Sequence, residues 1–225
     1  MVVGGPIYPV GLVVKGRRCL VVGGGRVAAR KIDGLLACGA AVTVVAPEVH
    51  EAIGALAGSG AIAAIDESPL DVQLRPYRAG EAAAYRLVIA ATGDHGVDDA
   101  VHRDAEAAGV WVNVADDPAR CTFVLPAVGR AGPVSVSVST GGASPALAGW
   151  LRDRVMGALG PGTAELALLL EEARRRVHER GGSTEDVDWR SLLDGPLPAL
   201  VRQGRTAEAR AAIDAFLEAV TSPPS

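Results

Sequence analysis

Three small residues follow a short apolar run with a spacing that suits phosphate binding. Gly23, Gly25 and Ala28 fit the pattern Gly-x-Gly-x-x-Ala, directly after the apolar residues 20–22. The first glycine permits a tight turn, the second lets an anion approach the backbone, and the alanine lets a helix pack closely on the strand. The free N–H groups of residues 26–28 would then point toward the anion. The pattern predicts a dinucleotide site whose pyrophosphate lies against this turn.

A second apolar run and an acidic residue follow at distances that suit the same site. Residues 41–46 are apolar and rich in valine, which predicts a second buried strand. Glu48 follows about twenty residues after Ala28, where an acid can bind a ribose hydroxyl. Glu48 equally suits the first turn of a helix over 48–56, where negative charge is favoured. Both interpretations of Glu48 stay open.

A third apolar run ends in another turn that could face a ligand. Residues 86–92 predict a strong buried strand, followed by Gly93 and Asp94. Open α/β sheets bind ligands at the carboxyl ends of their strands, so Thr92 is a further candidate contact through its hydroxyl or backbone. We expect helices over 27–38, 48–56 and 97–108, and further strands over 8–14, 61–65, 74–77 and 110–114. This alternation predicts a Rossmann-like parallel sheet, hence an α/β fold.

The pattern changes after residue 116. Residues 134–139 alternate valine and serine, which predicts a half-exposed antiparallel strand, and residues 122–128 precede it across the turn at Gly132 and Pro133. Two strands alone form a marginal unit. We therefore expect them to pair with another element, most economically a second subunit.

The rest of the chain is expected to be helical. Ser144 suits the N-cap, and Pro145 the first position, of a helix over 145–156. Further helices are expected over 164–179, 190–193, 196–203 and 206–219, with a frayed tail at 222–225. We divide the chain into a dinucleotide-binding Rossmann domain (1–114), a β-rich dimerisation segment (115–148) and a helical C-terminal domain (149–225).

Composition excludes several classes of protein. Of the 225 residues 49% are hydrophobic, which excludes a disordered chain, and the net charge of −4 gives no reason to expect nucleic acid as a partner. No apolar run is long enough to span a membrane, and the apolar N-terminus lacks the basic start and cleavage site of a signal peptide. Cys19, Cys38 and Cys121 lack metal-site spacing, as do the four histidines. We therefore expect a cytoplasmic protein with reduced thiols and no metal site.

Six motifs in this order resemble one known family, the precorrin-2 dehydrogenase/sirohydrochlorin ferrochelatase family, which is the N-terminal part of siroheme synthase. The motifs are Gly-Gly-Gly-Arg-Val-Ala-Ala-Arg-Lys (23–31), Val-Thr-Val-Val-Ala-Pro-Glu (42–48), Leu-Val-Ile-Ala-Ala-Thr (87–92), Val-Asn-Val-Ala-Asp-Asp-Pro (112–118), Phe-Val-Leu-Pro-Ala (123–127) and Ser-Thr-Gly-Gly-Ala-Ser-Pro-Ala-Leu-Ala (139–148). The resemblance covers residues 7–216 and is closest to the stand-alone form without a methyltransferase domain.

The resemblance implies a homodimer in which precorrin-2 gives up a hydride to NAD⁺ and a proton, which yields sirohydrochlorin. In bifunctional members Fe²⁺ is then inserted to give siroheme, held transiently by the pyrrole nitrogens and a carboxylate. The implied cofactor contacts are Gly23, Gly24, Gly25, Arg26, Val27, Pro47, Glu48 and Thr92.

The family's catalytic aspartate corresponds to Asp116. The residues alone favour a capping role for Asp116 in the turn before Asp117 and Pro118, and only the resemblance favours catalysis. Asp117 is the substitute candidate for catalysis. Removal of a proton from a ring carbon or a pyrrole nitrogen requires such a base.

The carboxylates of precorrin-2 should bind guanidinium groups. The candidates in sequence are Arg120, Arg130, Arg152 and Arg154. Arg30 and Lys31 are less suited, because their helix packs on the sheet.

Three residues depart from the family pattern. Gly93 and Asp98 replace a usual Asp and Asn, and Thr140 replaces a Ser that some members phosphorylate. The changes at Gly93 and Asp98 keep open a chelatase that lacks hydride transfer. A second alternative is an NAD(H)-sensing dimeric regulatory module.

Overall fold

The computed structural model describes residues 7–58 and 70–221, and these divide into two compact units, residues 1–125 and 126–225. The positions of the two units relative to each other are not determined, so each is described by itself.

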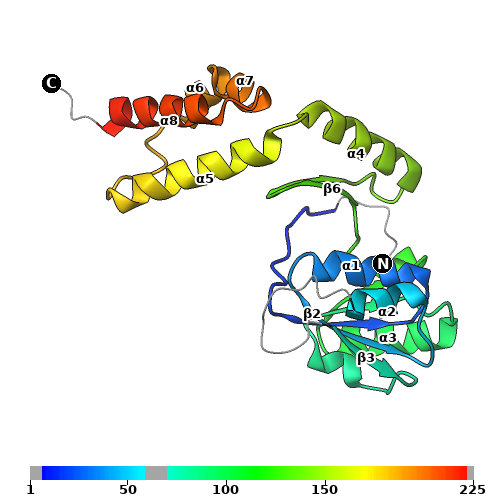
Figure 1. The fold of residues 1–225 in the computed structure, drawn as a ribbon. Coiled ribbons are helices and arrows are strands. Elements are labelled where there is room, and N and C mark those ends of the chain that lie inside the picture. The colour runs from blue at the N-terminus through cyan, green and yellow to red at the C-terminus, as the bar shows by residue number, and fades with distance from the viewer. Residues whose placement is uncertain (1–6, 59–69, 222–225) are drawn as a thin grey trace. The chain divides into compact units, whose positions relative to one another are not determined.

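The first unit is built on a five-stranded parallel sheet with the strand order β3-β2-β1-β4-β5 (Figure 1). Its strands are β1 (Arg18–Val22), β2 (Ala41–Ala46), β3 (Leu70–Leu74), β4 (Leu87–Ala90) and β5 (Trp111–Val114). Its helices are α1 (Arg26–Leu36), α2 (Glu51–Gly58) and α3 (His95–Ala107), with short 3-10 turns η1 (Glu81–Ala84) and η2 (Pro118–Arg120). The Rossmann-like α/β prediction is confirmed, because every strand pair of this sheet is parallel.

The two faces of the sheet carry separate apolar cores. One core joins α1 and α2 to the sheet, and Ile32 and Ile53 are fully buried in it. The other joins α3 to the opposite face through Val101 and Ala105. Because β1 and β4 face helices on both sides, their apolar runs are continuous, as expected of a parallel sheet.

Two of the expected strands in this unit differ in the structure. Residues 8–14 form no strand, and Tyr8 and Val13 are 85% and 86% exposed. Pro9 has no N–H to donate to a neighbouring strand, and Gly11 has no side chain to pack on a sheet. Both residues therefore weaken this apolar run as a strand. The strand expected over 74–77 is instead β3, which ends at Leu74. The strand expected over 61–65 lies outside the described residues.

The second unit begins with an antiparallel hairpin covered by a helix. Strands β6 (Ala127–Ala131) and β7 (Val134–Val138) pair in antiparallel orientation, with the valines of β7 half-buried and its serines exposed. The first strand, expected over 122–128, instead begins after Pro126, which has no N–H for a strand ladder. Helix α4 (Pro145–Leu159) packs on this hairpin so closely that a Cβ on Gly129 would lie 2.5 Å from Met156 Cγ. The backbone N–H of Leu147 donates to Ser144 Oγ, which confirms the predicted N-cap.

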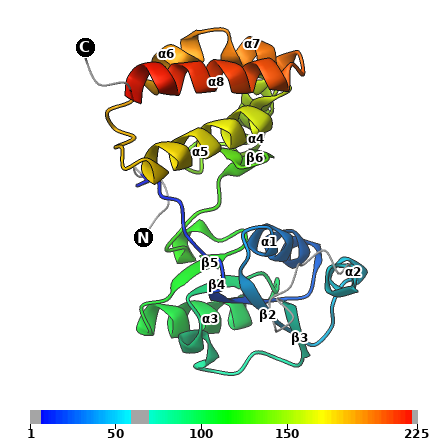
Figure 2. The same cartoon turned by 60° about the vertical axis from the view of Figure 1, so that its left-hand side comes forward.

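The remaining helices form a small core of their own (Figure 2). They are α5 (Thr163–Glu179), α6 (Trp189–Asp194), α7 (Leu197–Arg202) and α8 (Thr206–Thr221), close to the predicted ranges. Leu197 and Leu217 are fully buried between them. The predicted tail at 222–225 lies outside the described residues.

Candidate functional site

The glycine turn between β1 and α1 is tightly enclosed at two positions and open at the third. A Cβ on Gly23 would lie 2.2 Å from the Ala91 carbonyl oxygen, and Gly23 also has a φ of +125°. A Cβ on Gly24 would lie 1.9 Å from the Glu48 carbonyl oxygen. A Cβ on Gly25 would meet nothing within 4 Å. The first two glycines are therefore required by the fold, whereas Gly25 borders open space.

Hydrogen bonds hold this turn at the point where the strand order reverses. Gly23 N donates to the Val45 carbonyl at 2.9 Å, and His50 N donates to the Gly24 carbonyl at 2.7 Å. The turn thus lies between the carboxyl ends of β2 and β4, at the switch point where open α/β sheets bind ligands.

The start of α1 offers free donors to an anion. Gly25 is the N-cap and provides no side-chain acceptor, and the first bond back to it comes from Ala29 N at 3.0 Å. The N–H groups of Arg26, Val27 and Ala28 therefore have no acceptor among the described residues. Together with the open space at Gly25, this arrangement fits the pyrophosphate of a dinucleotide.

Pro47 and Glu48 are exposed in the loop that follows β2. Helix α2 begins only at Glu51, which occupies the acidic first-turn position. The interpretation of Glu48 as a first-turn residue is therefore wrong. Glu48 remains a candidate for a ribose hydroxyl, and its own carbonyl packs on Gly24.

The side chain of Thr92 is engaged within its own loop. Its Oγ1 donates to Asp98 Oδ1 at 2.7 Å, and Asp94 N donates to Thr92 Oγ1 at 3.0 Å. Asp98, on the first turn of α3, is only 5% exposed and also accepts a bond from Thr92 N at 3.3 Å. Sequence reasoning treated Asp98 only as a departure from a family pattern. The structure shows that it fixes the loop at the end of β4.

Asp116 follows β5 in an unusual backbone conformation. Its φ is +61°, and among the described residues it is the only non-glycine residue with a positive φ. Such strain persists where the surroundings impose it and is concentrated at functional sites. The carboxylate is exposed and makes no hydrogen bond or ion pair with a described residue. The structure therefore gives no support to a capping role for Asp116.

The neighbouring carboxylate, Asp117, is already paired. It accepts a short charge-assisted hydrogen bond from Arg120, whose Nε also lies 3.2 Å from Asp99 Oδ1. These pairs neutralise Asp117 and occupy one of the four candidate substrate arginines. Asp116 is therefore free to bind a ligand or accept a proton, whereas the carboxylate of Asp117 is already held by Arg120.

The chain after Asp116 is tied back to β5. The buried amide of Asn113 donates to the Phe123 carbonyl at 3.0 Å, and Thr122 N donates to the Val112 carbonyl at 2.8 Å. Cys121 Sγ lies 3.3 Å from the backbone nitrogen of Val114. Cys121 Sγ also lies 3.3 Å from the carbonyl oxygens of Val114 and Asp117, so this side chain links the loop to the strand. Burial raises the pKa of the Cys121 thiol.

Helix α1 brings a second charge toward this loop. Lys31 is half-buried and interacts electrostatically with Asp116 and Cys121. Burial, assisted by the charge of Arg30, lowers the pKa of the Lys31 ammonium, and Asp116, followed by Cys121, opposes that shift. Sequence reasoning gave this lysine little weight because α1 packs on the sheet. No signal in the sequence marks the proximity of Lys31 to Asp116.

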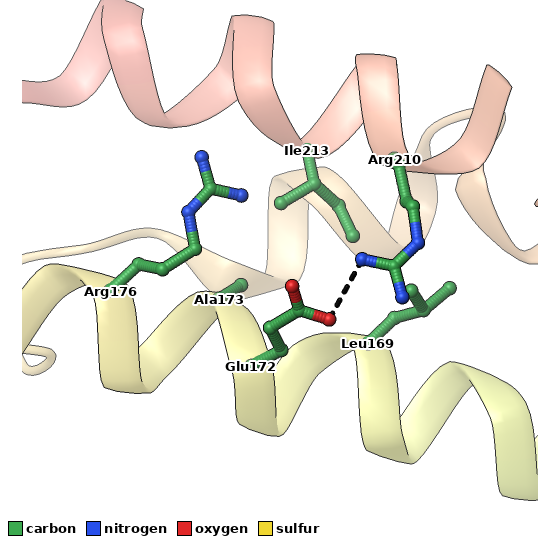
Figure 3. Close-up of a pocket in the computed structure, with 6 residues that line it drawn as sticks. All are labelled: Leu169, Glu172, Ala173, Arg176, Arg210 and Ile213. Atoms are coloured by element: carbon green, nitrogen blue, oxygen red, sulfur yellow. Dashed lines mark hydrogen bonds and ion pairs between the residues drawn. The ribbon is translucent and has the colours of Figure 1, made fainter. Parts of the chain in front are cut away.

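The other candidate substrate residues belong to the second unit. Arg152 pairs with Asp153 at 2.7 Å, Arg154 stacks 5.0 Å from the ring centroid of Trp150, and Arg130 is exposed on β6. This unit also contains a small pocket between α5 and α8 (Figure 3). The pocket is lined by Leu169, Glu172, Ala173, Arg176, Arg210 and Ile213.

The charged side chains that line this pocket are held in ion pairs. Glu172 and Arg210 form an ion pair at 2.8 Å across it (Figure 3). Arg176 forms a second ion pair, with Asp214, at 2.7 Å. These pairs join α5 to α8, and the pocket contains none of the residues predicted for the site.

Two further features concern the described residues as a whole. Across residues 7–58 and 70–221, no group of three or more histidine, cysteine or acidic side chains is arranged to hold a metal ion. None of the helices over the same residues has the length and apolar character needed to cross a membrane.

Comparison with known proteins agrees with this geometry. Residues 10–127 match a family described as "Putative NAD(P)-binding", and residues 131–156 match one described as "Sirohaem biosynthesis protein central". The siroheme synthase of Nitrosococcus oceani is 38% identical over 212 residues, which cover 93% of this chain and 44% of that protein. That of Methylococcus capsulatus is 39% identical over 203 residues, which cover 89% of this chain and 41% of that protein.

The chain thus spans less than half the length of these siroheme synthases. A solved structure named "SirC, precorrin-2 dehydrogenase" superposes with a TM-score of 0.69 at 27% identity, covering 95% of this chain and 98% of that one. The chain therefore belongs to the NAD(P)-binding family that matches more than half its length, and its resemblance to the precorrin-2 dehydrogenase/sirohydrochlorin ferrochelatase family is confirmed.

Proposed function

We propose that this chain oxidises precorrin-2 to sirohydrochlorin, with NAD⁺ as the hydride acceptor. The observation that carries the proposal is the pairing of an open glycine turn with an unpaired carboxylate at the same edge of one parallel sheet. Gly25 follows β1, and Asp116 follows β5, so both lie where the strands of this sheet end. The likeness to SirC, named as a precorrin-2 dehydrogenase, supports this assignment.

The residues that would hold the dinucleotide lie between β1 and β2. The N–H groups of Arg26, Val27 and Ala28 would bind its pyrophosphate, and Glu48 would accept a bond from a ribose hydroxyl. Because a carboxylate at Glu48 repels a 2′-phosphate, we assign NAD rather than NADP. The cofactor, when bound, supplies an acceptor for the hydride that precorrin-2 gives up.

Asp116 would remove the proton that accompanies hydride loss. A carboxylate accepts a proton from a ring carbon or a pyrrole nitrogen when it lies within hydrogen-bond reach. Asp116 suits this role because its oxygens have no other partner among the described residues, whereas those of Asp117 are held by Arg120. The left-handed backbone of Asp116 sets the direction in which that carboxylate leaves the strand.

The same carboxylate would serve Fe²⁺ insertion, if the protein is bifunctional like some members of its family. Metal insertion into sirohydrochlorin releases two pyrrole N–H protons, so it needs a base at the same place. Fe²⁺ would enter as a co-substrate held by the pyrrole nitrogens and Asp116.

We further propose that the chain works as a homodimer in the cytoplasm, with residues 115–148 as the dimerisation segment between the domains 1–114 and 149–225. The hairpin supports this proposal, because only two strands, β6 and β7, make up its sheet. Trp150 and Leu147 on α4 are 54% and 46% exposed, which adds apolar surface beside the hairpin. Cys19, Cys38 and Cys121, all of which the structure describes, are thiols rather than disulfides, which suits a reducing compartment.

The test is anaerobic turnover of precorrin-2 with NAD⁺, monitored by NADH formation. We expect Asp116→Ala to lower kcat by about 100-fold or more while the Kd for NAD⁺ changes less than about twofold. Asp117→Ala is the matched control and should keep kcat within about threefold, because its carboxylate is committed to Arg120. Equal turnover of wild type and Asp116→Ala would remove Asp116 from the mechanism.

Addition of Fe²⁺ to the same reaction distinguishes the alternatives. Accelerated loss of the sirohydrochlorin spectrum identifies a bifunctional enzyme. If folded protein binds NAD⁺ but forms no NADH from precorrin-2, the dehydrogenase assignment is wrong. Iron insertion without NADH formation would then favour a chelatase, and neither activity would favour an NAD(H)-sensing module.

A further inference from the structure

Lys31 is an unusual cation for this chain. The sequence contains 22 basic side chains, of which only Lys15 and Lys31 are lysines. Lys15 is exposed in the turn before β1, whereas Lys31 is half-buried on α1. Burial of an ammonium is costly unless a partner compensates for the lost water.

The packing of the first unit places Lys31 beside the loop that carries Asp116. Ala28 and Ile32, on the same helix, belong to the core against which Phe123 packs. Asn113 holds the carbonyl of Phe123, so the segment after β5 is fixed on the α1 side of the sheet. Lys31 interacts electrostatically with both Asp116 and Cys121 across this contact.

The two charges remain separate. Neither Lys31 nor Asp116 forms an ion pair within 4.0 Å with any residue that the structure describes. The Lys31 ammonium therefore has hydrogen-bond donors to spare, and the Arg30 charge beside it adds repulsion rather than relief. An anionic group placed next to Lys31 would accept a charge-assisted hydrogen bond from its ammonium. No described residue accepts such a bond from Lys31.

We propose that Lys31 is a substrate-binding residue, whose ammonium binds a carboxylate side chain of the tetrapyrrole while Asp116 faces the ring. This inference rests on the proposed function, since precorrin-2 and sirohydrochlorin carry many acetate and propionate groups. A lysine suits the role because its compact charge lies on a flexible stem that can follow such a side chain. The ammonium would hold the substrate, and Asp116 would act on it.

The first experiment is chemical modification of the whole wild-type chain by reductive methylation, with each lysine quantified by mass spectrometry. Lys15 is the internal control, because it is exposed and lies outside the proposed site. We expect saturating sirohydrochlorin to slow methylation of Lys31 by about fivefold or more and to leave Lys15 unchanged. Equal rates at Lys31 with and without sirohydrochlorin would overturn the inference, whether or not the protein turns over precorrin-2.

The second experiment compares Lys31→Met, Lys31→Arg and the control Lys15→Met. Loss of one charge-assisted hydrogen bond predicts that Lys31→Met raises the KM for precorrin-2 and the Kd for sirohydrochlorin by roughly 10- to 100-fold. We expect kcat to stay within about threefold, the Kd for NAD⁺ to stay unchanged, and Lys31→Arg to recover part of the affinity. Lys15→Met should match the wild type in every measurement.

The outcomes separate this inference from the proposed function. No NADH from wild-type protein would refute the dehydrogenase assignment. Wild-type turnover combined with an unchanged KM in Lys31→Met, or with a loss confined to kcat, would refute the binding role of Lys31. If a thermal unfolding curve shows that Lys31→Met does not fold, the methylation rates of the wild type decide whether Lys31 binds the tetrapyrrole.

Discussion

Replacement of Gly25 by valine should abolish NAD⁺ binding without unfolding the protein. Gly25 has a φ of −83° and a ψ of −176°, a region open to any residue, and its Cβ would meet nothing within 4 Å. The new side chain would project into the space where the pyrophosphate meets the helix N-terminus. The substitution therefore acts on the ligand rather than on the fold.

The magnitude follows from the bonds that the ligand would lose. Hydrogen bonds to a charged group contribute about 1.5–3 kcal/mol each, so loss of two of them costs about 3 kcal/mol or more. That cost corresponds to a Kd for NAD⁺ raised more than about 100-fold. The cost to stability is about 1 kcal/mol or less, the value of a poorer N-cap residue.

The matched control is Gly24→Ala, one residue earlier. Its Cβ would lie 1.9 Å from the Glu48 carbonyl oxygen, so backbone must shift and the cost should be about 3 kcal/mol. For a chain of this size, that predicts a thermal midpoint lower by roughly 6–12 °C, against about 4 °C or less for Gly25→Val. Calorimetric titration with NAD⁺ and a thermal unfolding curve measure both effects.

One result would refute this reasoning about Gly25. If Gly25→Val keeps the wild-type fold and binds NAD⁺ within about threefold of the wild-type Kd, the pyrophosphate does not lie at this turn.

The remaining predictions concern titration and reactivity of buried groups. Burial alone would raise the pKa of Glu81, but hydrogen bonds, chiefly from Arg75, outweigh it and lower that pKa. The ionised pair therefore stabilises the fold above the unfolded pKa of about 4.3, and this contribution is lost as pH falls through the folded pKa. Arg75→Ala should lower the free energy of unfolding at pH 7 by about 1 kcal/mol and flatten its dependence on pH below 5, as denaturant titrations would show; an unchanged pH profile would contradict the assignment. Burial raises the pKa of Cys19 to about 11, so at pH 7.5 iodoacetamide should alkylate the exposed Cys38 at least about tenfold faster, by peptide mass spectrometry. Comparable rates at the two cysteines in folded protein would show that β1 opens readily.

Local patterns predicted most of the first unit. The apolar runs at β1, β2 and β4 are buried on both faces, and a continuous run of that kind predicts a buried strand from its own residues. The same criterion failed at residues 8–14, which are apolar but unpaired. A run of hydrophobic residues becomes a strand only if a neighbour accepts its hydrogen bonds, and that neighbour is not encoded within the run.

The candidate site also combines features that local sequence predicts with contacts that only the folded chain shows. Sequence patterns were enough to predict the glycine turn, the Ser144 cap of α4 and the family motifs, because each depends on residues close together in the chain. Other relations are visible only in the folded chain. Asp116 is unpaired whereas Arg120 neutralises Asp117, Asp98 holds Thr92, and Lys31 interacts electrostatically with Asp116 in the loop after β5. These relations join residues from 3 to 85 positions apart, and each depends on backbone torsions and contacts that arise only when the chain folds.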